Sequence, residues 1–360
     1  MQMEFDENVP LAPYTTLRVG GPARWFAEAT SEPDVAMAVA FARDRRLPLF
    51  VLGGGSNLLV SDGGFPGLVL RVGLRGIAAT GEDHPGGKVA YSVGAGEPWD
   101  VFVAYAVERK QAGLECLSGI PGLVGGTPVQ NVGAYGQEVS QTIHQVRAYD
   151  RRALAYVLLS NAECGFAYRC SIFNTTERDR YIVTRVEYLL TPDGAPTVSY
   201  QDLKLYFKGS EATLRTVRQV VLEIRARKGM VISQGDRDSL SAGSFFKNPV
   251  EPSAMLSRIA AALQLPEESV PHYPAGETHI KLPAAWLIEQ AGFKKGYQLG
   301  AAAISSRHTL AIVNCGEARA RDIIALRDQI VEAVDRRFGI RLQPEPVWVG
   351  GGPLPPPERI

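Results

Sequence analysis

The nineteen residues at positions 118–136, SGIPGLVGGTPVQNVGAYG, contain six glycines and no charged residue. An ordinary exposed loop mixes glycine and proline with polar residues and is rarely this apolar. Because glycine has no Cβ, a glycine-rich main chain can approach another surface closely. This composition therefore predicts that the main chain of the segment packs closely against a large, flat and partly uncharged surface or ligand.

A second glycine-rich loop lies about sixty residues earlier, in VLGGGSNLLVSDGG at 51–64. The N–H groups of such a loop can turn onto an anion. It is not a nicotinamide-type Rossmann loop, because Leu58 stands where the third glycine is needed, and it lacks the Gly-Lys-Ser/Thr of a Walker loop. Considered alone, a tight turn is an equal alternative. The two loops together suit a long dinucleotide lying between them, with its pyrophosphate on residues 53–57.

Apolar periodicity, punctuated by glycine and proline, divides the chain into three α/β units and a tail. The predicted bounds are 1–73, 74–229, 230–338 and 339–360. Ser31 and Asp34 have the spacing of a helix cap, which predicts a helix ending near Arg46. Further helices are predicted at 98–113, 213–229, 252–263, 284–292 and 318–337. Strands are predicted at 23–30, 47–52, 67–72, 88–96, 180–190, 308–314 and 340–350.

Charge and cysteine content narrow the class of partner. Lys and Arg number 38, as do Asp and Glu, and no basic run suggests a nucleic-acid partner. No uncharged apolar run is long enough to span a membrane, and the acidic N-terminus does not resemble a secretory signal. The four cysteines form no CxxC motif and no metal-binding pattern, and the five scattered histidines are interpreted as surface or core residues. We expect a cytoplasmic protein without a metal.

Six motifs follow one another in a fixed order from about Leu11 to Gly350: TTLRVGGPA, GGGSNLLV, SGIPGLVGGTPVQNVGAYG, YRCSIF, AGSFFKNP and a C-terminal PE. This order resembles the UDP-N-acetylenolpyruvoylglucosamine reductase family, in its longer subclass with a mobile tyrosine loop. The resemblance implies an α+β chain with the FAD-binding fold of the vanillyl-alcohol-oxidase (PCMH) type. Two flavin-binding α/β subdomains, 1–73 and 74–229, would precede a C-terminal α/β substrate-binding domain.

The resemblance also implies an activity. FAD, reduced by NADPH, would reduce the enolpyruvyl group of UDP-N-acetyl-3-O-(1-carboxyvinyl)-glucosamine to UDP-N-acetylmuramate, a peptidoglycan precursor. The expected partner is this UDP-linked sugar nucleotide, with no nucleic acid or membrane, and the chain would be a monomer or a weak oligomer. Two other classes remain open: another FAD-linked oxidase or dehydrogenase of the same fold, and a sugar-nucleotide sensor without catalysis.

Three catalytic residues follow from the resemblance. Ser244 of AGSFFKNP matches the proton donor, Arg169 of YRCSIF matches the arginine that holds the substrate carboxylate and the developing enolate, and Glu345 matches a carboxyl group that assists there. A planar guanidinium suits a carboxylate better than an ammonium does. On spacing alone, Ser244 would be a turn residue, Arg169 a partner in a structural salt bridge and Glu345 a solvated side chain.

The remaining site residues are also carried over by resemblance. The substrate-binding candidates are Tyr135, Tyr200, Lys228, Asn248 and Gln298. The cofactor-binding candidates are Gly53, Gly54, Gly55, Ser56, Asn57, Ser118, Gly119, Pro121, Gly122, Gly126, Asn131, Gly133 and Ala134. The chain departs from the family pattern at Asn174, where many relatives carry lysine, and in PEPVWVG. The stretch between Lys228 and Ser244 is also longer than the pattern, which leaves the register of Lys228 open.

Overall fold

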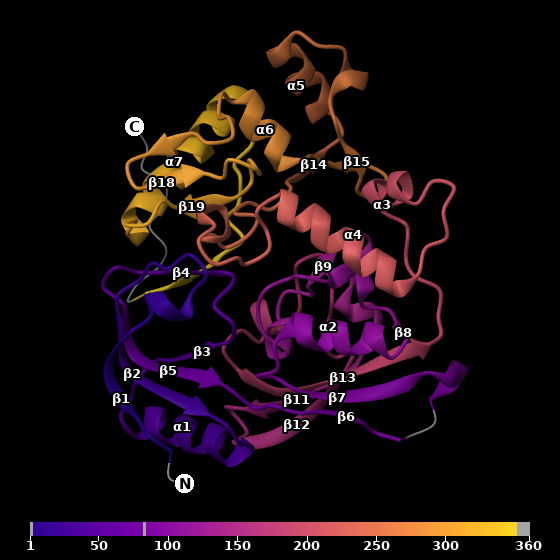
Figure 1. Cartoon of the computed structure of the whole chain (residues 1–360). Coiled ribbons are helices and arrows are strands. Elements are labelled where there is room, and N and C mark those ends of the chain that lie inside the picture. Colours follow the sequence, from indigo (N-terminus) through magenta and orange to yellow (C-terminus); the bar gives the residue numbers. More distant parts are fainter. Residues whose placement is uncertain (1–2, 82–83, 351–360) are drawn as a thin grey trace. The chain divides into compact units, whose positions relative to one another are not determined.

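The computed structural model describes residues 3–81 and 84–350 (Figure 1). The chain divides into two compact units, each built from three segments. Unit 1 comprises Met1–Val9, Ala23–Gly55 and Pro66–Arg227, and unit 2 comprises Pro10–Pro22, Ser56–Phe65 and Lys228–Ile360. The segment predicted as 1–73 is thus shared between both units. The predicted proline-rich tail at 351–360 lies outside the described residues.

The first sheet of unit 1 has the strand order β1-β2-β5-β3. Its strands are β1 (Asp6–Pro10), β2 (Pro22–Ala29), β5 (Phe65–Val72) and β3 (Leu49–Leu52). Helix α1 (Glu32–Asp44) connects β2 to β3 and begins at the predicted cap, where Ser31 and Asp34 form a capping box. The apolar stripe Val35, Ala38, Val39 and Ala42 is buried, so this helix prediction is confirmed.

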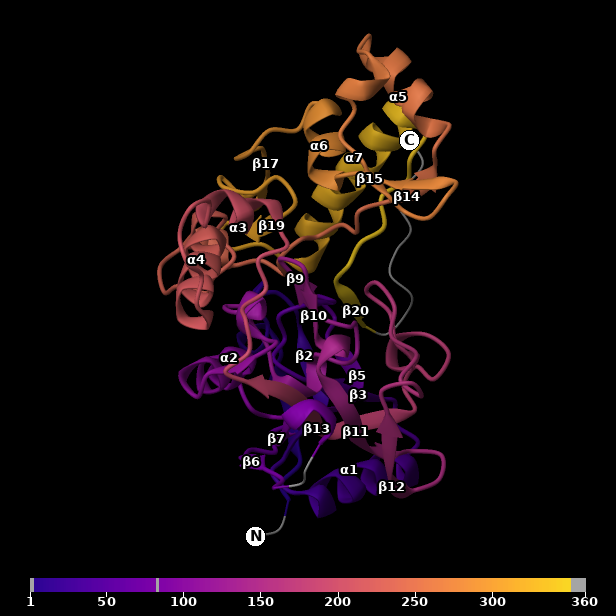
Figure 2. The same cartoon turned by 90° about the vertical axis from the view of Figure 1, so that its right-hand side faces the viewer.

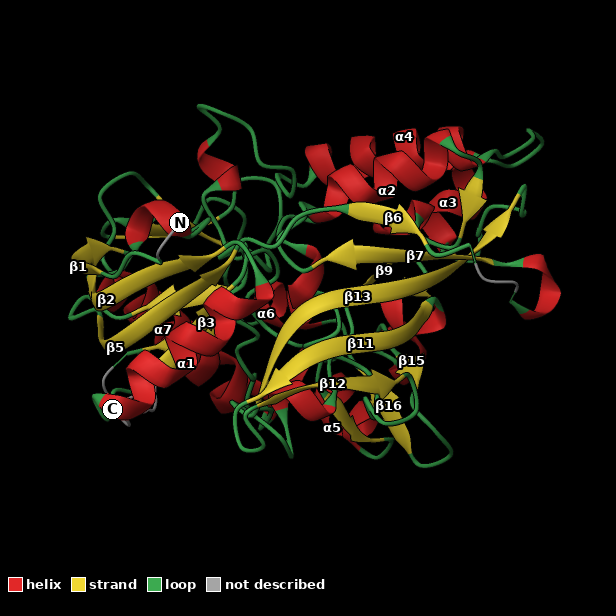
Figure 3. Ribbon diagram, turned by 90° about the horizontal axis from the view of Figure 1, so that it is seen from below, coloured by secondary structure: helices red, strands yellow, loops and turns green. Residues whose placement is uncertain are grey.

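The second sheet of unit 1 is antiparallel, with the order β12-β11-β13-β7-β6 (Figure 3). Its strands are β12 (Ala155–Ser160), β11 (Ile143–Asp150), β13 (Tyr181–Pro192), β7 (Val89–Gly94) and β6 (Ile77–Ala79), and the short β8 (Gln111–Ala112) pairs with the end of β13. Helix α2 (Trp99–Glu108) packs on this sheet, since the ring of Phe102 lies 5.0 Å from that of Tyr188.

Helix α4 (Leu214–Arg227) packs on α2 through an ion pair between Arg218 and Asp100, 2.6 Å apart, and is preceded by α3 (Gln201–Tyr206) (Figure 1). The predicted end of α2 at Gly113 is wrong. The helix ends at Glu108 because Lys110 takes a left-handed conformation, with φ 55°, and the chain then enters β8.

Unit 2 is built around helix α7 (Ala320–Phe338), which contacts a three-stranded sheet of β17 (Gln298–Leu299), β18 (Ala302–Ile304) and β19 (Ile312–Asn314) (Figure 2). Its other elements are α5 (Met255–Leu263), α6 (Ala284–Gln290), β14 (Val250–Pro252), β15 (Tyr273–Pro274), β16 (His279–Lys281), and the parallel pair β4 (Leu58–Val60) and β20 (Val347–Val349). The strands predicted at 308–314 and 340–350 are therefore shorter than expected. Residues 305–310 instead form a turn, in which the N–H of Ala311 bonds to the carbonyl of His308.

No helix in the described part of the chain is both long enough and apolar enough to cross a membrane.

Candidate active site

The two glycine-rich loops meet at Gly54 and Gly122, both in unit 1. Strand β3 ends at Leu52, and a Cβ added at Gly54 would lie 2.5 Å from the Cα of Gly122 and 3.1 Å from the main-chain nitrogen of Leu123. Main chain thus packs directly on main chain, which only glycine allows at this distance. The packing accounts for the glycine at position 54 and places the two glycine-rich loops side by side.

The second loop is fastened to the segment between β7 and α2. The N–H of Trp99 bonds to the carbonyl of Gly122 at 3.0 Å, and the N–H of Val124 bonds to the carbonyl of Glu97 at 2.9 Å. A Cβ added at Gly53 or Gly126 would meet no heavy atom within 4 Å, so the main chain at these two positions is open to approach. Open main chain of this kind suits the pyrophosphate of a dinucleotide, because successive backbone N–H groups can bind an anion.

Two predicted cofactor ligands, Ser118 and Asn131, use their side chains to hold the loop itself. Ser118 is buried and donates its hydroxyl hydrogen to the carbonyl of Glu115 at 2.7 Å. The amide of buried Asn131 donates to Glu138 at 2.9 Å and to the carbonyl of Ala167 at 3.1 Å. These two positions would therefore reach a cofactor through the main chain, a distinction that the motif alone does not contain.

Tyr135 and Tyr200, predicted to bind substrate, lie together in unit 1. Tyr135 forms the tip of a hairpin between β9 (Gly133–Ala134) and β10 (Gln137–Glu138), and its ring is 5.4 Å from that of Tyr200, nearly perpendicular. A Cβ on Gly136 would come 2.1 Å from the hydroxyl of Ser199, so glycine lets the Tyr200 segment approach the hairpin. Burial raises the pKa of Tyr135 to about 12, so its hydroxyl is a hydrogen-bond donor at neutral pH.

Arg169 belongs to the same part of unit 1. Its Nη2 donates to the carbonyl of Gly133 in the β9–β10 hairpin at 3.0 Å, and its backbone is left-handed, with φ 55°. Asn174, one of the departures from the family pattern, supports this turn: its amide donates to the carbonyl of Arg169 at 3.2 Å, and its oxygen accepts from the N–H of Ser171 at 2.9 Å. Asn174 thus holds the backbone of the turn that carries Arg169.

Ser244 and Glu345 lie on two neighbouring segments of unit 2. The N–H of Glu345 bonds to the carbonyl of Phe245 at 2.9 Å, the N–H of Lys247 bonds to the carbonyl of Gln343 at 2.9 Å, and Phe246 forms a bridge with Pro344. Both Ser244 and Glu345 are half-buried. The structure thus pairs the main chains of two segments about one hundred positions apart in the sequence, with Glu345 opposite Phe245, the residue after Ser244.

Asn57, a predicted cofactor ligand, belongs to this same region of unit 2. Its amide donates to the carbonyl of Glu345 at 3.3 Å, and its carbonyl accepts from the N–H of Val347 at 2.9 Å. The carbonyl of Ser56 accepts from the hydroxyl of Thr16 at 3.4 Å. The end of the first glycine-rich loop is therefore tied to the segment that carries Glu345.

The other predicted substrate ligands of unit 2 have diverse surroundings. Asn248 accepts from the N–H of Ala284 at 2.9 Å at the start of α6, and exposed Gln298 donates to the carbonyl of Gly300 at 2.8 Å. Lys228 lies near His308, whose pKa is lowered to about 4, first by burial and then by the charges of Lys228 and Lys295. His308 is half-buried, and these two lysines are the charged groups that act on it.

Comparison with known proteins identifies two domains. An FAD binding domain model matches residues 23–153, and a model for the C-terminal domain of UDP-N-acetylenolpyruvoylglucosamine reductase matches residues 236–349. The chain is 47% identical over 352 residues to the UDP-N-acetylenolpyruvoylglucosamine reductase of Streptomyces coelicolor, with 95% of this chain and 90% of the relative covered. It is 46% identical over 358 residues to the reductase of Thermobifida fusca, with 97% of this chain and 99% of the relative covered.

The structure is similar to the crystal structure of UDP-N-acetylenolpyruvylglucosamine reductase from Thermus caldophilus, with a TM-score of 0.62, 28% identity and coverage of 97% of this chain and 99% of that chain. The first domain match includes both glycine-rich loops, and the second includes Ser244, Asn248, Gln298 and Glu345. The predicted fold class, an FAD-binding domain followed by the C-terminal domain of these reductases, is therefore confirmed. The chain belongs to the UDP-N-acetylenolpyruvoylglucosamine reductase family.

Proposed function

We infer that the protein is a flavoprotein that uses NADPH to reduce the enolpyruvyl group of UDP-N-acetyl-3-O-(1-carboxyvinyl)-glucosamine, yielding UDP-N-acetylmuramate for peptidoglycan synthesis. The full-length match to the reductases carries this function. The contact between Gly54 and Gly122 supports it, because it forms a main-chain cradle inside the part of the chain that matches the FAD binding domain.

The proposed cradle for FAD is formed by the main chain of residues 53–57, 118–126 and 131–134. The chemistry that a bound FAD would supply is hydride transfer from NADPH to the substrate. The residues of this chain then have to hold the substrate and complete the reaction. Negative charge develops at C2 of the enolpyruvyl group and on its carboxylate, which calls for a cation and hydrogen-bond donors there, and a proton must reach C2.

We assign these tasks to the three catalytic candidates. Arg169 binds the carboxylate with its planar fork and stabilises the charge that develops beside it. Ser244 donates the proton to C2, and Glu345 assists at the same centre from the segment paired with that of Ser244. Tyr135, Tyr200, Lys228, Asn248 and Gln298 bind the sugar nucleotide. The contact between Tyr135 and Tyr200 supports the tyrosine-loop subclass as part of this proposal.

The proposed location is the cytoplasm, and the proposed assembly is a monomer or a weak oligomer. All four cysteines are free, and Cys116 and Cys164 are buried with pKa values raised, chiefly by desolvation. Thiols of this kind are typical of proteins in a reducing compartment.

The function is tested by the visible spectrum of the purified protein under anaerobic conditions. We expect a yellow protein whose flavin absorbance is bleached by NADPH and restored when the enolpyruvyl nucleotide is added. Bleaching followed by reoxidation only with oxygen would instead indicate an oxidase of the same fold. A protein that binds the nucleotide without reoxidation would indicate a sensor that lacks catalysis.

The cradle itself gives a second prediction. Gly54→Ala places a methyl group against the main chain of Gly122, and overpacking of this kind costs about 1–3 kcal/mol, so we expect FAD affinity to fall by about tenfold or more. The measurement is the ratio of flavin to protein absorbance after dialysis. Gly63→Ala is the matched control, because its Cβ would lie 3.7 Å from the nearest side-chain atom and its FAD content should not change. If Gly54→Ala keeps its full FAD content, the proposal that the main chain at Gly54 and Gly122 holds FAD is wrong.

A further inference from the structure

The long stretch between Lys228 and Ser244 folds back onto its own beginning. Gly229 is left-handed, with φ 66°, and a Cβ added there would lie 2.7 Å from the Cβ of Asp238. Asp238 therefore packs directly on the turn that follows Lys228. The stretch forms a closed loop, so the backbone at Gly229, directly after Lys228, is held by a contact nine positions further along the chain.

Asp238 is itself held by the turn between β18 and β19. Its Oδ1 accepts from the N–H of Ser306 at 2.8 Å, and its Oδ2 accepts from the hydroxyl of Ser306 at 2.6 Å. The Nε of Arg307 lies 3.3 Å from the same Oδ2. Burial alone would raise the pKa of Asp238, but these bonds outweigh it and lower the pKa, so the carboxylate is ionised at neutral pH.

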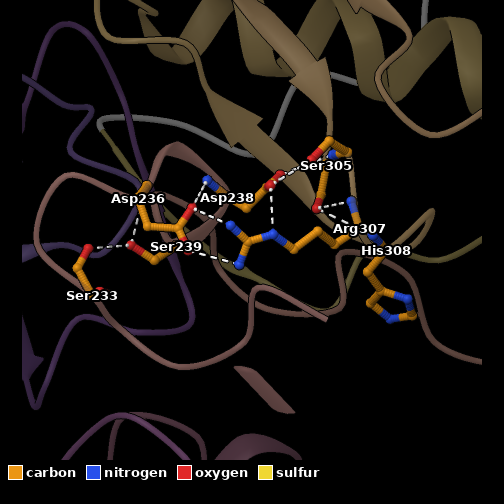
Figure 4. A network of polar contacts seen from close by, with 8 residues as sticks. Ser233, Asp236, Asp238, Ser239, Ser305, Arg307 and His308 are labelled. Carbon is orange, nitrogen blue, oxygen red and sulfur yellow. Dashed lines mark hydrogen bonds and ion pairs between the residues drawn. The ribbon is translucent and has the colours of Figure 1, made fainter. Parts of the chain in front are cut away.

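Arg307 connects Asp238 to Asp236, as Figure 4 shows. Its Nη1 and Nη2 donate to the two carboxylate oxygens of Asp236 at 2.9 and 3.1 Å. Asp236 in turn accepts from the N–H of Asp238 at 3.0 Å. The side chain of Arg307 is 40% exposed and that of Asp238 only 11%, so water reaches the guanidinium more than it reaches the carboxylate.

The turn at 305–310 also bonds to the Ser244 end of the loop. The N–H of Phe245, which follows Ser244, bonds to the carbonyl of Leu310 at 2.7 Å. His308 lies between these anchor points and is close enough to Lys228 for the ammonium to depress its pKa. Residues 305–310 thus hold the loop at the Lys228 end through Asp238 and at the Ser244 end through Leu310.

We propose that Asp238, anchored by Ser306 and Arg307, is a positioning residue that fixes the turn at Lys228 and Gly229 and so presents the Lys228 ammonium to the anionic part of the sugar nucleotide. Lysine has a long flexible stem, and a fixed backbone reduces the freedom that is lost when the ammonium binds an anion. The identity of the anion rests on the proposed function. The role of Asp238 rests on the contacts within unit 2.

The first test is a steady-state comparison using the FAD-loaded full chain. Asp238→Ala should raise the KM for the enolpyruvyl nucleotide by about tenfold, change kcat by less than about threefold and leave flavin reduction by NADPH unchanged. Arg307→Ala should raise KM less, because Asp238 keeps both of its bonds from Ser306. Asp335→Ala is the matched control, since it removes a carboxylate of unit 2 that pairs with Arg341 at 3.4 Å, and all three quantities should stay at wild-type values.

A double-mutant cycle separates positioning from general support of the fold. If Asp238 acts through Lys228, Asp238→Ala combined with Lys228→Ala should have the KM of Lys228→Ala alone. If the KM of the double variant rises by the product of the two single-variant factors, the proposal is overturned. A loss of kcat in Asp238→Ala without a change in KM would overturn it too. If Asp238→Ala does not fold, Ser306→Ala removes only the hydroxyl bond, and the same cycle should show a smaller, equally non-additive KM change of about threefold.

Wild-type turnover of the enolpyruvyl nucleotide is measured first. Its absence would overturn the proposed function, and with it the presentation of Lys228 to this substrate. Turnover in the wild type together with multiplying effects in the cycle would overturn the role of Asp238 alone.

Discussion

Replacing Ser244 with alanine is expected to slow turnover of the enolpyruvyl nucleotide by about 10²–10⁴-fold, the range typical of a lost general acid. The physical reason is that C2 of the substrate loses its proton donor, whereas hydride transfer from NADPH to the flavin does not involve Ser244. Reduction of the flavin by NADPH should therefore remain within about twofold of the wild-type rate. Rapid-mixing measurements of the two half-reactions distinguish these effects.

A serine of the same segment provides the control for Ser244. The hydroxyl oxygen of Ser241 accepts from the N–H of Gly243 at 3.3 Å, and Ser241→Ala should leave both half-reactions close to wild type. Wild-type turnover in Ser244→Ala would reject the proton-donor role. Equal slowing of both half-reactions would indicate a disturbed flavin site instead.

Replacing Arg169 with alanine is expected to lower kcat by about 10²–10³-fold, corresponding to about 3–4 kcal/mol, as for a lost oxyanion donor. The guanidinium stabilises charge that develops only in the transition state, so kcat and kcat/KM should fall together. Arg169→Lys keeps the charge but loses the planar fork, and its rate should lie between those of the wild type and Arg169→Ala. Steady-state kinetics with the enolpyruvyl nucleotide measure all three.

The control for Arg169 has to exclude a general structural effect, because Arg169 also donates to the carbonyl of Gly133. FAD content and the melting temperature of each variant should therefore be measured beside the kinetics. Arg178→Ala removes an exposed arginine of the same region, 4.0 Å from Asp179, and should retain wild-type kcat. A near-wild-type rate in Arg169→Ala would remove this residue from the proposed site.

Local features of the fold could be predicted because they depend on neighbouring residues. Ser31 and Asp34 lie within one helical turn, so their spacing was enough to locate the start of α1. The glycine-rich composition of residues 51–64 and 118–136 likewise indicated where the main chain could be approached closely. The end of α2 could not be predicted, because the chain leaves the helix to pair Gln111 and Ala112 with β13, a strand about eighty residues later.

Other mispredictions have the same origin. The strand expected at 308–314 begins only at Ile312. Residues 305–310 form a turn instead, in which Ser306 bonds to Asp238 and the carbonyl of Leu310 accepts from the N–H of Phe245. The apolar pattern of HTLAIVN suits a strand, but hydrogen bonds from distant residues decide where it starts.

The family and the positions of the two glycine-rich loops could be predicted from the sequence, because motifs and periodicity are local properties of the chain. The folded chain was needed to show that Gly54 packs on Gly122, that the Ser244 segment pairs with the Glu345 segment, and that Asp238 lies on Gly229. The first two contacts join residues about seventy and one hundred positions apart, and the third closes a loop between residues nine positions apart. Such contacts depend on how whole elements bury their apolar faces, which no single stretch of residues specifies.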